Sequence, residues 1–281
     1  MKQSNQQTTD EQYLTEQQYA TEDQLRVRIS THELFSQPKT NFPQWVLEHL
    51  NWQDIHTVLD IGCGAGIYIP YLQKFLFDEG VIISADLSLG MLRDVAKKSF
   101  ANGANLLNAR ARHIPLPDSS CDVVLANHML YHIPDIPTVI QEIRRVLRPG
   151  GSFVAATNAE SSMLGFLDEF KKACQSLGVS LPNLQAFFRK NFTLESGGNY
   201  ITPYLKQMEI HNLESELVFP ESTPVLAYIQ SMHTFYQSHL PAHIRWSSVL
   251  DQLQKQIDTI IQYQGVFRVQ KKTGVFIAYK G

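Results

Sequence analysis

The stretch Val58-Leu-Asp-Ile-Gly-Cys-Gly-Ala-Gly66 is an apolar run that breaks into three closely spaced glycines. A buried strand ends in this way when it turns sharply against a ligand, because glycine has no Cβ and lets the ligand approach the main chain. A second apolar run, Val81-Ile-Ile-Ser-Ala-Asp86, ends in a carboxylate. In a parallel sheet the ends of two such strands are neighbours, and the carboxylate can accept hydrogen bonds from both hydroxyls of a ribose. The two motifs together predict a nucleoside-binding site.

The spacing of the glycines bears on which nucleoside is bound. Dinucleotide sites use G-x-G-x-x-G, because a pyrophosphate rests on the N-terminus of the following helix. Here the order is Gly62-Cys-Gly64-Ala-Gly66, and Asp60 stands at the start of the loop. A carboxylate at that point would repel a pyrophosphate but suits the ammonium group of an amino acid. The stretch resembles motif I of the class I S-adenosylmethionine (SAM) methyltransferases.

Three later blocks strengthen this resemblance. They are Ala109–Asp118, which reads ARARHIPLPD, Ser119–Asp135, which reads SSCDVVLANHMLYHIPD, and Ile140–Gly151, which reads IQEIRRVLRPGG. In order and spacing they are similar to the adenine-binding loop of that family, to its fourth strand with the functional tip, and to the helix and turn before its fifth strand. The resemblance covers about residues 40–160.

The alternation of strand and helix patterns between residues 56 and 157 predicts an α/β fold with a doubly wound parallel sheet. Runs such as Val123-Val-Leu-Ala126 are apolar throughout, as expected when both faces of a sheet are covered. Ser88 is placed to cap the helix that follows it. The family resemblance implies a Rossmann-like sheet of seven strands, mostly parallel, with a last strand at 274–279 that is antiparallel and lies beside the fifth.

Helical patterns at 161–190 and 223–262 have no place in the minimal fold, and we expect them to form a cap over the carboxyl ends of the strands, where ligands of such sheets bind. The expected regions are a disordered tail (1–10), N-terminal lid helices (11–50), a SAM-binding core (51–160), a cap insertion (161–207), and the C-terminal strands of the core (208–281) with a helical cap insertion at 223–262.

The resemblance implies SAM as the cofactor and assigns a set of residues to it. Asp60 corresponds to the partner of the methionine ammonium group, the glycines seat the ligand, and Asp86 corresponds to the partner of the ribose hydroxyls. The full set of expected cofactor-binding residues is Asp60, Gly62, Cys63, Gly64, Gly66, Asp86, Leu87, Met91, Ala111, Arg112 and Asn127.

The adenine loop departs from the family pattern at one position. Many relatives have Asp-Ala where this chain has Arg110-Ala111, and arginine has no acceptor for the adenine amino group. Either the backbone of Ala111 and Arg112 binds adenine while Arg110 stacks on it or points outward, or adenine is held more weakly than usual. A surface role for Arg110 is the simpler interpretation.

The sequence indicates the residues that contact the methyl acceptor less clearly. Tyr131 and His132 follow the fourth strand, where the methyl donor would face its acceptor, and a histidine can take a proton near neutral pH; packing under the cap is the alternative. Relatives with a similar Leu-Tyr-His-Ile-Pro-Asp run act largely on small molecules. The remaining candidates for substrate contact are Arg28 and His32, which share a helical face, and His233 and Tyr236 in the predicted cap.

Composition narrows the classes of function. A formal net charge of −3 argues against a dedicated nucleic-acid binder, and three cysteines without a C-x-x-C pair indicate neither a disulfide framework nor a zinc site. No metal is expected. The N-terminus lacks the apolar segment of a signal peptide and no apolar run reaches eighteen residues, which predicts a cytoplasmic protein that does not cross a membrane.

We therefore expect a SAM-dependent methyltransferase that acts on an oxygen, nitrogen or carbon atom of a small molecule. Two alternatives stay open. A tRNA or protein methyltransferase would show an open basic groove, and a SAM-binding protein without catalysis would lack space for an acceptor. The oligomeric state is not indicated by the sequence.

Overall fold

The computed structural model describes residues 11, 14, 15, 19, 21–76, 80–181, 184 and 191–281. The tail predicted at residues 1–10 lies outside them. The described strands are β1 (Ser36–Gln37), β2 (Thr57–Ile61), β3 (Val81–Asp86), β4 (Asn105–Asn108), β5 (Cys121–Leu125), β6 (Leu147–Asn158), β7 (Lys206–Phe219) and β8 (Phe267–Tyr279). The α-helices are α3 (Asp23–Phe35), α4 (Phe42–Leu47), α5 (Ile69–Phe75), α6 (Leu89–Ala96), α7 (Ile136–Val146), α8 (Leu164–Ser176), α10 (Gly197–Ile201), α11 (Thr223–Gln230), α12 (His233–Gln237) and α13 (Trp246–Gln264).

These strands form one sheet in the order β1-β7-β8-β6-β5-β2-β3-β4. Strands β2 to β6 pair in parallel, while β8 pairs antiparallel with both β6 and β7. The Rossmann-like fold and the antiparallel last strand beside the fifth core strand are confirmed. The predicted number of seven strands is too low by one, because β1, a two-residue strand, pairs with β7 at Ser36 and Gln37. A pair so short leaves no periodic pattern in the sequence.

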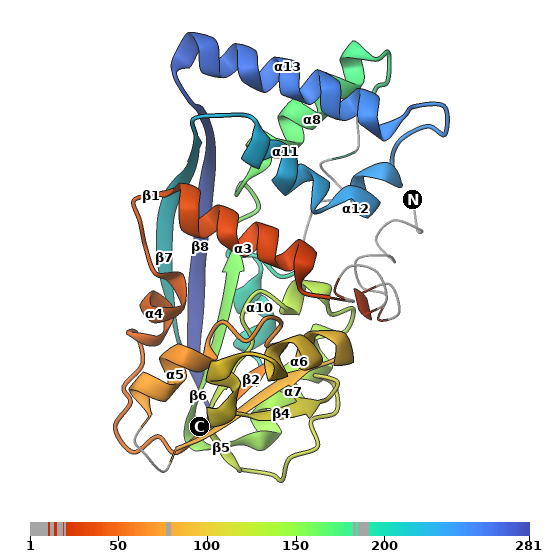
Figure 1. Ribbon diagram of the computed structural model, residues 1–281. Coiled ribbons are helices and arrows are strands. Elements are labelled where there is room, and N and C mark those ends of the chain that lie inside the picture. The colour runs from red at the N-terminus through yellow and green to blue at the C-terminus, as the bar shows by residue number, and fades with distance from the viewer. Residues whose placement is uncertain are drawn as a thin grey trace.

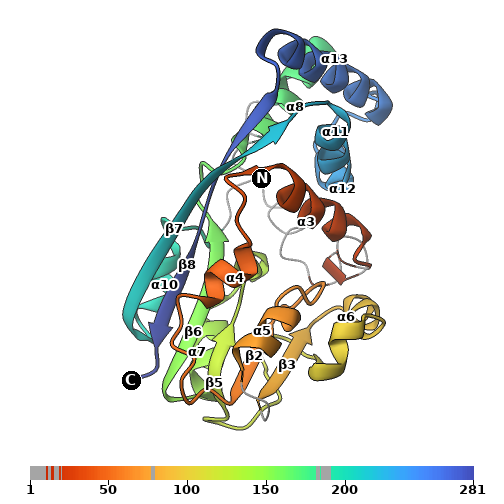
Figure 2. The ribbon, with the colours of Figure 1, turned by 60° about the vertical axis from the view of Figure 1, so that its left-hand side comes forward.

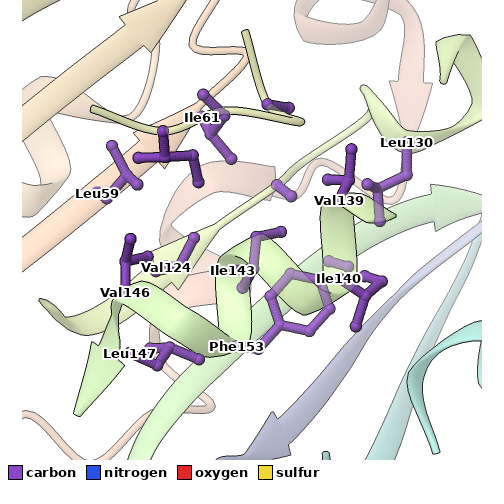
Figure 3. Close-up of a cluster of buried hydrophobic side chains, with 14 of the residues drawn as sticks. Leu59, Ile61, Val124, Leu130, Val139, Ile140, Ile143, Val146, Leu147 and Phe153 are labelled. Carbon is purple, nitrogen blue, oxygen red and sulfur yellow. The ribbon is translucent and has the colours of Figure 1, made fainter. Parts of the chain in front are cut away.

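Apolar side chains cover both faces of the sheet. On one face α7 contributes Ile136, Val139, Ile140, Ile143 and Val146, which pack on β2, β5 and β6 (Figure 3). On the other face α4 and α5 pack through Val46, Leu47 and Leu72. Helix α7 keeps this stripe because its buried residues recur at helical spacing, and Asp135 caps its first turn by accepting a hydrogen bond from the Thr138 N–H.

A second apolar cluster lies beyond the carboxyl ends of the parallel strands. We call it the cap cluster; it joins α8, α11, α12 and α13 to the outer ends of β7 and β8. Figure 1 shows these helices gathered at one end of the molecule, with the long strands β7 and β8 running up to them. Phe219 and Phe267 form the last pair of the two-stranded ribbon of β7 and β8. The segment between them, residues 220–266, therefore begins and ends at neighbouring positions.

Helix α3 lies between the cap cluster and the sheet (Figure 2). Its C-terminal Phe35 packs on Phe219 with ring centroids 4.9 Å apart, and its His32 meets Tyr228 of α11 edge-on at 6.1 Å. Helix α10, in contrast, packs on the sheet through Ile201. The carboxyl ends of β2, β3 and β5 therefore face a space that α3 and the cap helices enclose.

Candidate functional site

A cavity of about 1630 Å³ lies in this space. Its lining comes from the ends of β2 and β3, the segment after β5, helix α3, the cap helices α8, α11 and α12, and one face of β8. Sites for one small ligand usually measure about 300–1,000 Å³. The cavity is large enough for two small molecules side by side.

The glycine loop after β2 forms one wall. Gly62, Gly64 and Gly66 all have positive φ, and the N–H groups of Gly62 and Cys63 both donate to the carbonyl of Ala85, at 2.7 and 3.0 Å. A Cβ on Gly62 would lie 2.8 Å from Cβ of Met129, which is closer than real side chains approach. Gly62 is therefore required both for its backbone conformation and for its contact with the segment after β5.

Asp60, at the end of β2, is the most unusual group in the cavity. Its side chain is 1% exposed, and no described residue gives its Oδ2 a hydrogen-bond partner. Burial and the nearby charge of Asp86 raise the pKa of Asp60 to about 7. A buried carboxylate oxygen without a partner is costly, and a cation supplied by a ligand would satisfy it.

Asp86 ends β3 beside this loop and is better satisfied. Its Oδ2 accepts from the Gly64 N–H and its Oδ1 from the Ser88 N–H, both at 2.8 Å. Burial raises the pKa of Asp86, and these backbone hydrogen bonds partly oppose the rise. Ser88 also caps α6 by accepting from the Met91 N–H, as the sequence predicted.

The residues expected around adenine lie together next to Asp86. Leu87, Met91, Ala111 and Arg112 all line the cavity, and Met91 and Ala111 are buried. Arg110 is half-exposed, and its Nε donates to Glu11 at 2.8 Å. Arg112 contacts the same carboxylate at 3.4 Å. The two arginines thus connect the loop to the N-terminal segment, an arrangement that agrees with the surface role for Arg110.

The segment after β5 supplies Asn127, Tyr131 and His132. Asn127 is buried; its Oδ1 accepts from the Ala156 N–H at 2.9 Å, while its Nδ2 has no partner among the described residues. Burial raises the pKa of Tyr131, so its phenol stays protonated near neutral pH. The Nε2 of His132 lies 3.1 Å from the hydroxyl of Tyr19.

The substrate candidates separate into two groups. Arg28 and His32 line the cavity from α3. Arg28 donates through Nη1 to the Ser231 carbonyl at 3.0 Å, and its buried Nη2 has no described partner. Tyr236 lines the cavity but is fully buried against Phe170 at 4.3 Å.

His233 packs edge-on against Trp246 and is absent from the described cavity lining.

Among the cavity residues that sequence reasoning did not single out are Tyr19, Tyr228 and Lys271. The first two are brought in by contacts over more than a hundred residues of sequence, which no local pattern reports. Lys271 stands between Val269 and Val275 at alternating positions of the last strand, which marks it as unusual but does not indicate that it reaches the cavity.

Across the part of the chain that is described, no group of His, Cys, Asp and Glu side chains is placed to hold a metal ion. None of the described helices combines the length and the apolar character needed to cross a membrane.

Comparison with known proteins agrees with this geometry. Residues 59–155 match a family described as a methyltransferase domain. The demethylmenaquinone methyltransferase of Geobacillus kaustophilus is 32% identical over 124 residues, which cover 43% of this chain and 53% of that protein. A malonyl-[acyl-carrier protein] O-methyltransferase from Hamiltonella defensa is 30% identical over 184 residues, or 65% of this chain and 64% of that protein. The chain thus spans about half to two-thirds of the length of these relatives.

The fold is also found in solved structures. Phosphoethanolamine N-methyltransferase 2 from Haemonchus contortus, solved with phosphomonomethylethanolamine and S-adenosylhomocysteine, superposes with a TM-score of 0.56 and 16% identity. The match covers 97% of this chain and 60% of that protein. At this identity the likeness shows a shared fold.

Proposed function

We propose that this protein transfers the methyl group of SAM to a small-molecule acceptor, since residues 59–155 match a family described as a methyltransferase domain. One observation carries the proposal. The unpartnered carboxylate of Asp60 and the hydrogen-bonded carboxylate of Asp86 stand at adjacent strand ends, in a cavity with room for a second ligand.

The residues present fit the cofactor. Asp60 would bind the methionine ammonium group, which removes the cost of its buried charge. Asp86 keeps lone pairs free for the ribose hydroxyls, since each of its oxygens accepts one hydrogen bond among the described residues. Leu87, Met91 and Ala111 would hold adenine between apolar surfaces, and Arg112 would add backbone contacts. The orphaned Nδ2 of Asn127 is a donor aimed at the same cavity.

When bound, SAM would supply an electrophilic methyl group on a sulfonium; the acceptor would form a bond to this carbon, and the electron pair of the broken C–S bond would stay on sulfur. An acceptor O–H or N–H must also lose a proton. The neutral phenol of Tyr131 can position the acceptor by donating a hydrogen bond, whereas His132 is the group suited to take the proton. The enclosing cap and α3 would exclude water and hold the acceptor in line.

Helix α3 and the cap helices partly cover the cavity, which supports a small acceptor over tRNA or protein, because a macromolecule needs an open approach to the methyl donor. Arg28 would suit a carboxylate, either of the acceptor or of the cofactor itself. The acceptor atom, whether oxygen, nitrogen or carbon, stays open.

Two measurements test the proposal. Calorimetric titration with S-adenosylhomocysteine should show binding at one site per chain. Incubation with methyl-labelled SAM and a metabolite extract should then place the label in products of low mass. Absence of cofactor binding, or label found only in nucleic acid or protein, would refute the small-molecule assignment.

A further inference from the structure

One face of β8 runs from the cap to the core of the sheet. Side chains alternate along a strand, so residues 269, 271, 273, 275 and 277 point to the same side. Val269 packs in the cap cluster, and Val275 and Ile277 pack against the sheet core with α4 and α5. Lys271 and Thr273 lie between these two apolar regions and line the cavity. A lysine therefore occupies an inward position, beside Thr273, between two apolar stretches of the strand.

Lys271 has no counter-charge among the described residues. No ion pair or hydrogen bond of its ammonium group is present there, although Glu160 lines the same cavity. Its neighbour Lys272, on the outer face of the strand, pairs with Glu214 at 2.9 Å. Burial lowers the pKa of Lys271 to about 8, so the side chain is still mostly charged at neutral pH. A half-buried charge held on a rigid strand without a partner costs stability unless a ligand compensates it.

Two polar side chains near Lys271 are already engaged within the protein, whereas Ser215, which stands opposite Lys271 on β7, has a buried Oγ without a partner among the described residues. The hydroxyl of Thr273 donates to the Thr157 carbonyl at 2.9 Å, and the hydroxyl oxygen of Ser162 accepts from the Lys272 N–H at 3.0 Å. The Lys271 ammonium group is the charged donor that β8 offers to a ligand in the cavity.

The cofactor is badly placed to be that ligand. In the sheet order β8-β6-β5-β2, Lys271 stands three strands away from Asp60, roughly 14 Å across the sheet at about 4.8 Å per strand. The register puts Asp60 level with Ile277, so Lys271 also lies six residues, roughly 20 Å, farther along the strand direction. The ammonium and carboxylate of the methionine moiety are attached to one carbon atom, so binding at Asp60 keeps both far from β8. Lys271 faces the remaining volume of the cavity, where the acceptor would lie.

We propose that Lys271 binds an oxyanion group of the methyl acceptor, and hence that the acceptor is an anionic small molecule with an apolar body. The identification of this anion as the methyl acceptor rests on the proposed function. The physical claim, an anion site at Lys271 in the cavity, can be tested apart from methyl transfer.

The test uses two fluorescent probes that differ in one charged group: anilinonaphthalene sulfonate, and phenylnaphthylamine, which lacks the sulfonate. Both are titrated into the full chain in the presence of saturating S-adenosylhomocysteine. The variants are Lys271→Met, which keeps the length and removes the charge, Lys271→Arg, which keeps the charge, and Lys272→Met as the matched control on the outer face. Thermal melts establish that each variant is folded.

We expect Lys271→Met to weaken sulfonate binding about tenfold or more, as for the loss of a hydrogen bond to a charged group, and to leave phenylnaphthylamine binding unchanged. Lys271→Arg should retain most of the sulfonate affinity, and Lys272→Met should behave as the parent protein. Equal losses for both probes, an unchanged sulfonate affinity in Lys271→Met, or no sulfonate binding by the parent protein would each overturn the proposal. Failure of S-adenosylhomocysteine to bind would refute the proposed function instead, and the comparison of the two probes would still report on Lys271.

Discussion

Replacing Asp60 by asparagine should stabilise the ligand-free protein and weaken its binding of cofactor. The carboxyl group of Asp60 has a pKa of about 7 in the folded protein against 3.8 ordinarily, because it is buried and lies near Asp86. In the window from about pH 4 to pH 7 the unfolded chain releases this proton while the folded chain retains it. The folded state therefore loses stability as the pH rises through this window.

The size of the effect follows from the same values. A tenfold change in a protonation constant is worth about 1.4 kcal/mol, so a rise from 3.8 to about 7 corresponds to an upper limit of roughly 4 kcal/mol above pH 7. The asparagine amide is itself buried without a partner and keeps a penalty of about 1–3 kcal/mol. We expect Asp60→Asn to gain about 1–3 kcal/mol in free energy of unfolding over the parent at pH 8, and to lose this advantage at pH 4, where the carboxyl group of the folded parent is protonated.

Urea unfolding of the ligand-free protein between pH 4 and pH 8 measures this difference. Asp122→Asn is the control with the opposite sign: burial acts to raise the pKa of Asp122, but hydrogen bonds from the His56 and Thr57 N–H groups and from Arg148 outweigh it and lower the pKa. That variant should lose stability at pH 8 and less at pH 4. A stability difference between parent and Asp60→Asn that does not change with pH would refute the reasoning. Calorimetry at pH 8 should meanwhile show S-adenosylhomocysteine bound at least tenfold more weakly by Asp60→Asn.

Three further outcomes are expected. Asp86→Ala should weaken S-adenosylhomocysteine binding tenfold or more, since hydrogen bonds to a charged group are worth about 1.5–3 kcal/mol; unchanged affinity by calorimetry would remove Asp86 from the ribose site. Arg110→Ala should change that affinity less than about fivefold, because the half-exposed pair with Glu11 is worth at most about 1 kcal/mol; a larger loss would indicate stacking on adenine. Gly62→Ala should lower the melting temperature more than Gly150→Ala, because both positions have positive φ but only the Gly62 site is blocked by Met129, and equal shifts would show that the backbone alone matters.

The cofactor half of the site could be predicted from the sequence because its determinants are local. The turn at Gly62, the carboxylate of Asp86 and the cap at Ser88 each sit within a few residues of a strand end, and parallel pairing then brings those ends together. The structure places these groups as expected, although their contacts with a cofactor remain proposals. The lid and cap regions likewise remain proposals as functional units.

The acceptor half could not be predicted because it is assembled from distant segments. His132 meets Tyr19 across 113 residues of sequence, and Lys271 reaches the cavity only because β8 extends beyond the core of the sheet. Strand β1 owes its existence to pairing with β7, and not to any pattern of its own. Such contacts depend on how the cap helices pack relative to the sheet, which no local sequence pattern reports.

The closing pair Phe219–Phe267 has a consequence for how this architecture can vary. Residues 220–266 enter and leave through one register-matched pair, so another helical insert can be joined there without shifting the strands that carry the nucleoside site. The new insert must cover Phe166 and Phe170 of α8, which pack on Tyr228 and Tyr236 of the present segment. Lys271 lies outside this segment, on the ribbon itself. Chimaeras made at this junction would therefore keep the preference of Lys271 for an anionic acceptor. The new helices would set the size and shape of the acceptor that fits, so the two properties could be varied independently.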